Sequence, residues 1–172
     1  MSRADLLDRV ITYLAGAGVG DRSLRQIATG AGTSHRMLIY HFGTRDALLV
    51  DVVRAVEERT RAALASLGAR SPREQAIEFW QRLSDPALAP YERLFFELYG
   101  AALAGQESFV PVLDGIVTSW LADEPRFAGL SLPRARMTLA FARGALLDLL
   151  ATGDRDAVDA SVREFIDLVW PE

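Results

Sequence analysis

Hydrophobic residues recur at helical spacing along nearly the whole chain. The first stripe runs through residues 6–14, and a long one through residues 48–67 follows the Gly-Thr pair at 43–44. Apolar positions three and four residues apart share one face of a helix, whereas a strand alternates with a period of two. We find no such alternation, no internal repeat and no low-complexity tract. The pattern predicts an all-α chain with about nine helices.

Start and stop signals divide the chain into helices. Glycines within 16–20 end the first stripe, and Ser23 with Gln26 has the spacing of a capping box. Residues 71–74, Ser-Pro-Arg-Glu, combine an N-cap serine with proline at the first helical position. Prolines at 86 and 90 break the chain before another helix. A further helix is predicted from the apolar positions Val112, Leu113, Ile116, Val117 and Trp120.

The last two helices differ in character. Residues 137–150 are hydrophobic nearly all round, which predicts a helix buried on more than one side. That helix either belongs to the core or packs inward on one side and against a second subunit on the other. Residues 158–169 form a conventional amphipathic stripe that Pro171 ends.

Residues 23–46 have the spacing of a helix-turn-helix. Ala28 is small where two helices would cross, and Gly32 permits the left-handed conformation of a tight turn. Leu38 follows six residues later and is expected to insert between the helices, with Leu24 and Ile27 completing the buried face.

Charge is distributed unevenly along the chain. The 172 residues carry a net charge of −4, contain no cysteine and contain arginine as the only strongly basic residue type. Residues 1–66 carry +2 and residues 67–172 carry −6, while the segment from Arg22 to Arg45 carries +4 with no acid. A basic segment on an acidic body is typical of a nucleic-acid-binding head.

The segment resembles the DNA-binding head of tetracycline-repressor-like (TetR-family) transcriptional regulators. The similarity covers about the first third of the chain and rests on residues 24–28, 31–34, Leu38, 42–46 and 48–49. It implies a three-helix head over residues 1–46, joined by the long helix from about residue 44 to a helical effector-binding and dimerisation domain over residues 47–172. It also implies a homodimer that binds a near-palindromic operator and is a repressor released by a small hydrophobic or aromatic effector.

Roles follow for residues of the head. Hydroxyl and backbone groups at the start of each helix are expected to meet phosphates, and side chains opposite Leu38 are expected to meet base edges. The predicted DNA contacts are Arg25, Thr33, Ser34, His35, Arg36, Ile39, Tyr40, His41, Thr44 and Arg45. The family has tyrosine where Ile39 stands and lysine where Arg45 stands, and only Arg3 precedes the first helix in place of a basic arm.

Aromatic residues of the body have two interpretations. They are either ordinary core residues or the lining of an effector pocket, with Glu78, Arg82, Glu97 and Arg143 as polar partners. The candidate ligand-binding residues are Phe79, Trp80, Phe95, Phe96, Tyr99, Trp120 and Phe141. The resemblance implies dimerisation through the last two helices, where the candidate interface residues are Phe141, Gly144, Ala145, Asp148, Val162, Phe165 and Ile166.

Other functional classes have less support. His35 and His41 are the only histidines, and they lack ligand partners before Asp46, so we expect no metal. We also expect no cofactor and no catalytic residues, because we locate no acid–base pair in the body. No run reaches the roughly 20 apolar residues of a membrane span. The first ten residues hold four charges, unlike a signal peptide, so we expect no membrane partner and a cytoplasmic protein. The main alternative is a helical ligand-binding or scaffold protein that does not bind DNA.

Overall fold

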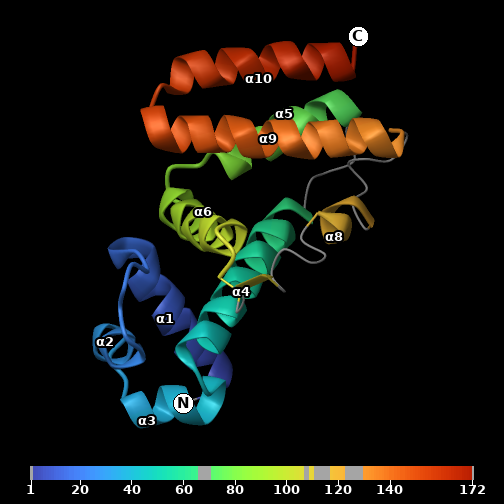
Figure 1. Cartoon of the computed structure of the whole chain (residues 1–172). Coiled ribbons are helices and arrows are strands. Elements are labelled where there is room, and N and C mark those ends of the chain that lie inside the picture. The colour runs from blue at the N-terminus through green and yellow to red at the C-terminus, as the bar shows by residue number, and fades with distance from the viewer. Residues whose placement is uncertain (1, 66–70, 107–108, 111–116, 123–129, 172) are drawn as a thin grey trace. The chain divides into compact units, whose positions relative to one another are not determined.

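A computed structural model describes residues 2–65, 71–106, 109–110, 117–122 and 130–171 (Figure 1). Within these ranges the chain forms nine α-helices and no strand, which confirms the predicted fold class. The helices are α1 (Arg3–Ala17), α2 (Leu24–Gly30), α3 (His35–Phe42), α4 (Arg45–Ala65), α5 (Pro72–Leu83), α6 (Ala89–Leu103), α8 (Thr118–Ala122), α9 (Leu132–Thr152) and α10 (Arg155–Val169). The helix expected from Val112 is seen only as α8, because residues 112, 113 and 116 lie outside the described residues.

Local signals set the helix starts. The capping boxes at Ser23 and Ser71 are present, and a third at Ser2 begins α1. Hydrogen bonds from the side chain and the backbone N–H of Ser2 lower the pKa of the Asp5 carboxyl. Helix α6 begins at Ala89, so Pro90 lies inside its first turn, where a missing N–H leaves no bond unmade.

The chain divides into two compact units. The first consists of Met1–Arg59 and Pro90–Asp114, and the second of Thr60–Ala89 and Gly115–Glu172. The predicted head, residues 1–46, lies within the first unit, and its boundary at residue 46 stays a prediction. None of the described helices is long and apolar enough to span a bilayer.

The first unit buries the apolar faces of α1 to α4 and of α6. Helix α1 contacts α2, and α2 contacts α3. Its fully buried side chains include Leu6, Val10, Ile11, Leu14, Ile27, Leu38, Leu48, Leu49, Val52, Leu94 and Leu98. The buried residues of the first, second, third and long helices therefore lie on their predicted stripes, whereas Leu7 and Leu24 are half-buried and the part of the long stripe from residue 63 lies outside the described side chains. This core fixes the short helices α2 and α3, which are too short to be stable alone.

The second unit is built on α5, α9 and α10. Helix α10 contacts both α5 and α9, and α8 contacts α9. Helix α9 buries Ala135, Leu139 and Leu146 but leaves Met137 63% and Leu147 50% exposed. The prediction that this helix is buried on more than one side is therefore not met within one protomer, because none of the described residues covers the surface opposite its buried face.

Candidate nucleic-acid interface and apolar cleft

The turn between α2 and α3 has the geometry that its sequence predicted. Ala28 and Leu38 are buried, and Gly32 has a φ of 65°. The Thr33 N–H donates to the Ala28 carbonyl at 2.9 Å, and the Gly32 N–H donates to the Thr29 carbonyl at 3.1 Å. This pair of bonds is a Schellman motif, which ends a helix at a left-handed residue and turns the chain sharply. Glycine is required at position 32 because residues with a side chain rarely adopt this left-handed backbone conformation.

Helix α3 presents a solvent-facing surface. Ser34 is its N-cap, with its Oγ accepting from the Met37 N–H at 3.2 Å. Leu38 and Phe42 face the core, while Arg36, Ile39 and Tyr40 are exposed, Tyr40 by 79%. An exposed arginine and an exposed aliphatic side chain on one helix match the edges of guanine and the methyl of thymine.

The other predicted contact residues border this surface. His35 and His41 are half-buried, and the Tyr40 and His41 rings meet edge to face at 4.9 Å between centroids. Arg25 and Thr44 are exposed, and the Thr44 Oγ accepts from the Ala47 N–H at the start of α4. The Thr33 Oγ is buried and makes no hydrogen bond within the described residues.

Arg3 is bound to the first unit. Its guanidinium pairs with Asp51 of α4 at 2.5 Å and lies 4.9 Å from the centre of the Phe42 ring. Its Nε also donates to the His41 carbonyl at 3.4 Å. Arg3 is the first residue of α1 and does not precede it, and because these bonds use its side chain, it is held against α3 and α4.

Arg45 is also engaged within the protein. Its Nε donates to the Arg22 carbonyl at 2.7 Å, and its Nη2 donates to the Gly20 carbonyl at 2.8 Å. Its Nη1 lies 3.5 Å from an Asp46 carboxylate oxygen. The guanidinium predicted to bind phosphate thus joins the start of α4 to the loop between α1 and α2. No local pattern identifies this role, since the partners lie 23 and 25 residues away.

The candidate ligand-binding aromatics fall into separate groups. Phe95 stacks on Tyr99 and meets Phe96 edge to face on α6, in the first unit. Trp120 packs with Leu139 and with the partly buried Phe79 in the second unit, and the Arg61 guanidinium lies 5.5 Å from the centre of the Trp120 ring. Phe79 also lies close to Trp80 and Phe141.

These three aromatics line an apolar cleft between α5, α9 and α10. The full lining is Pro72, Ala76, Phe79, Trp80, Thr138, Leu139, Phe141, Ala142, Val162, Phe165, Ile166 and Trp170. No charged side chain occurs among these described residues. The cavity volume is about 50 Å³, and ligand pockets typically measure about 300–1,000 Å³. The cleft must therefore widen to admit an aromatic molecule.

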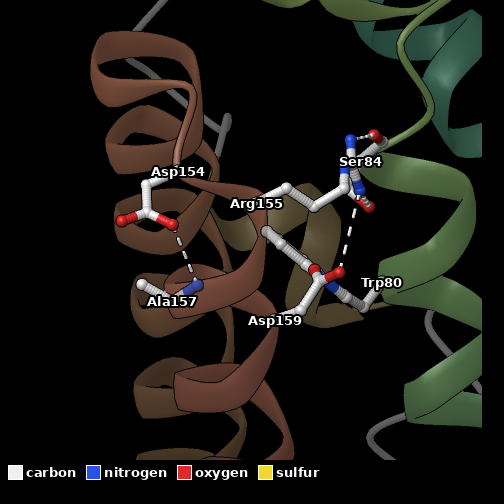
Figure 2. A network of polar contacts seen from close by, with 6 residues as sticks. All are labelled: Trp80, Ser84, Asp154, Arg155, Ala157 and Asp159. Atoms are coloured by element: carbon white, nitrogen blue, oxygen red, sulfur yellow. Dashed lines mark hydrogen bonds and ion pairs between the residues drawn. The ribbon is translucent and has the colours of Figure 1, made fainter.

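Polar bonds hold α5 against α10 beside the cleft (Figure 2). The Trp80 Nε1 donates to the Asp159 carboxylate at 2.7 Å, which fixes the orientation of the indole. Arg155 donates to the Oγ of the buried Ser84 at 3.2 Å and also to its backbone carbonyl. Farther along the helices, Arg73 pairs with Asp167 at 2.6 Å. Sequence reasoning identified none of these bonds, because their partners lie 71–94 residues apart.

The candidate interface residues occupy two different surfaces. Val162 and Ile166 are buried within the protomer, and the Phe141 and Phe165 rings stack at 3.9 Å between centroids in the cleft. Ala145 is half-buried, whereas Gly144 and Asp148 are exposed. Gly144 belongs to an exposed apolar row at helical spacing on α9, which comprises Met137, Ala140, Gly144, Leu147 and Ala151. We call this row the α9 stripe.

Comparison with solved structures identifies the class of fold as that of helix-turn-helix regulators. A TetR-family transcriptional regulator of a Rhodococcus species matches with a TM-score of 0.79 and 21% identity, covering 97% of each chain. The multidrug binding protein EbrR in complex with imidazole matches with a TM-score of 0.76 and 25% identity, covering 99% of this chain and 90% of that chain. The complex of EbrR with proflavin matches with a TM-score of 0.71 and 26% identity, covering 98% of this chain and 99% of that chain.

The chain therefore has the fold of TetR-family transcriptional regulators over nearly its whole length, which confirms the resemblance inferred from its head. No protein-family model and no curated protein matches the sequence.

Proposed function

We propose that the protein is a sequence-specific DNA-binding transcriptional regulator whose α3 enters the major groove. The observation that carries this proposal is the exposed surface of α3, with Arg36 and Ile39 opposite the buried Leu38, on a segment of charge +4. The fold of its structural neighbours, which include transcriptional regulators, supports the same function. In this role α3 reads bases while Arg25, Ser34 and Thr44 lie where they can meet phosphates.

Selection of bound DNA from a random pool tests this function. We expect the full-length protein to enrich one near-palindromic motif, and its affinity to fall steeply with salt concentration because phosphate contacts release counterions. Enrichment of no motif would favour the alternative, a helical ligand-binding protein without DNA binding.

We further propose that the protein acts as a homodimer joined through the α9 stripe. Five small or apolar residues in an exposed row allow two helices to approach closely, and leaving such a row in water is unfavourable. Leu147→Glu places a charge in the middle of this row. Sedimentation is expected to show a monomer for this variant and a dimer for Arg134→Glu, a charge change at an exposed position off the row. A dimer in both variants would contradict the proposed interface.

The apolar cleft is the proposed effector site, and the protein is proposed to be a repressor that the effector releases. Its uncharged lining favours a neutral or weakly polar aromatic ligand that displaces the stacked Phe141 and Phe165 rings. EbrR, of the same fold, has been crystallised with imidazole and with proflavin. We expect naphthalene, a neutral aromatic probe, to quench the fluorescence of Trp80 and Trp170 and to weaken operator binding. Quenching without any change in operator affinity would contradict the repressor mechanism.

A further inference from the structure

The loop between α1 and α2 holds a carboxylate from a helix far along the chain. The Gly20 N–H donates to Glu97 Oε1 at 2.7 Å. The Val19 N–H is shared between both carboxylate oxygens, at 2.9 and 3.1 Å. Two successive backbone N–H groups aimed at one anion form an anion-binding turn. Glu97 lies on α6, so the turn connects α6 to the head within the first unit.

Glycine on both sides of Val19 makes this turn possible. Gly18 and Gly20 have φ values of 72° and 46°, a backbone region that favours glycine. A Cβ at Gly18 would lie 3.5 Å from Glu97 Oε2, an ordinary contact distance, so the need for glycine at this position comes from its φ. The loop is therefore shaped around the carboxylate, and the interaction is more specific than a chance surface contact.

The carbonyls of the same loop face cationic side chains of the head. Arg45, the first residue of α4, donates to the Gly20 and Arg22 carbonyls. Arg22 in turn donates to the Gly18 carbonyl at 2.9 Å. One six-residue loop thus bonds to α6 through its N–H groups and to the start of α4 through its carbonyls.

We propose that Glu97 is a positioning residue, which fixes α6 to the head and thereby restricts the direction in which α3 is presented. The inference rests on the proposed DNA-binding function and adds a requirement to it. A dimer reads two half-sites separated by a fixed distance, so a head with less freedom tolerates fewer half-site spacings. Glu97 therefore contributes to the choice of operator spacing without touching DNA.

Variants at position 97 separate this role from a loss of charge. Glu97→Ala removes both acceptors, whereas Glu97→Gln keeps one oxygen that can still accept from the Gly20 and Val19 N–H groups. Asp21→Ala serves as the matched control. Asp21 is an exposed acid of the same loop whose side chain makes no hydrogen bond within the described residues.

Amide hydrogen exchange tests the contact without DNA. We expect the Val19 and Gly20 amides to exchange slowly in the wild type and in Asp21→Ala, and to lose protection in Glu97→Ala. Fast exchange of both amides in the folded wild type would overturn the inference and would leave the proposed function unaffected.

Operator titrations test the consequence. Affinity is measured for the selected operator and for versions with one base pair added or removed between the half-sites. In Glu97→Ala we expect the preference for the native spacing to fall about 2- to 30-fold, the range typical of residues that couple two elements. Glu97→Gln should retain part of the preference, and Asp21→Ala all of it.

The ratio of affinities for the different spacings separates a positioning role from a general loss of stability in the variant. If Glu97→Ala binds all spacings equally less well, the preference is unchanged, the residue is merely structural and the inference is overturned. If the wild type selects no DNA at all, the proposed function fails, and exchange still reports on the contact.

Discussion

Replacing Arg45 by alanine discriminates between two roles for this residue. A phosphate contact is what its place at the start of α4 suggests, but its guanidinium donates to the Gly20 and Arg22 carbonyls at 2.8 and 2.7 Å. Its side chain is 29% exposed, so water replaces part of the lost bonding in the variant. Hydrogen bonds to charged groups contribute about 1.5–3 kcal/mol each when buried, and we therefore expect a loss of about 2 kcal/mol for the pair.

Two measurements on the Arg45→Ala variant follow from this magnitude. For a chain of this size, about 2 kcal/mol corresponds to a fall in Tm of about 4–8 °C. The slope of log affinity against log salt should stay as in the wild type, because no phosphate contact is removed. Arg25→Ala is the matched control, since Arg25 is exposed and its side chain makes no hydrogen bond within the described residues.

The control should show the reverse behaviour. Removing one phosphate contact from each protomer of the dimer reduces the salt slope by about 2 and leaves the Tm unchanged. If Arg45→Ala instead keeps the wild-type Tm and has the shallower slope, Arg45 binds phosphate in solution and the assignment of its guanidinium to the loop is refuted.

Three further substitutions test the head, with Gly16→Ala as a control for one of them. Arg36→Ala should weaken binding to the selected DNA by about 1–3 kcal/mol and relax the base preference at one position per half-site. An unchanged base preference in a repeated selection would show that Arg36 reads no base. Leu38→Ala, at a fully buried position, should lower the free energy of unfolding in urea by about 2–5 kcal/mol, and a loss below 1 kcal/mol would contradict its place between the helices. Gly30→Ala places a Cβ 2.1 Å from the Tyr13 ring and should lower the free energy of unfolding by about 1–3 kcal/mol in the same assay. At Gly16 an added Cβ meets no atom, so Gly16→Ala should stabilise α1. Equal effects of the two substitutions would show that Tyr13 does not pack on Gly30.

Sequence alone predicted the features that depend on near neighbours. Periodicity located the helices, and the spacing of Ala28, Gly32 and Leu38 predicted the turn in its observed form, because helix crossing and a left-handed residue are local requirements. Capping signals were also reliable, since the N-cap and the third helical residue meet within one turn.

Long-range bonds were beyond such reasoning. Glu97 was a possible polar partner for a ligand, yet its carboxylate binds backbone N–H groups 77 and 78 residues away. For Arg45, the local pattern shows a cation at a helix start but not the two carbonyls that the fold brings beside it, and its phosphate contact stays a prediction.

The aromatic residues show the same limit. Phe79, Trp80 and Phe141 line one cleft while Phe95, Phe96 and Tyr99 form another cluster, because the face that each side chain takes depends on which helices pack together. Likewise, a stripe such as that of Val162 and Ile166 is equally consistent with a partner subunit and with the protomer's own α5 and α9.

A footprint of the full-length protein on its selected operator tests the central claim most directly. Hydroxyl-radical cleavage should show two protected segments whose centres lie about 34–36 Å apart, one for each α3 of a dimer. Both protections should be lost together in Leu147→Glu if the α9 stripe joins the protomers. The protein concentration in this experiment is one that saturates binding of the pool from which the operator was selected. Uniform cleavage along the operator at that concentration would contradict the assignment of α3 as a recognition helix.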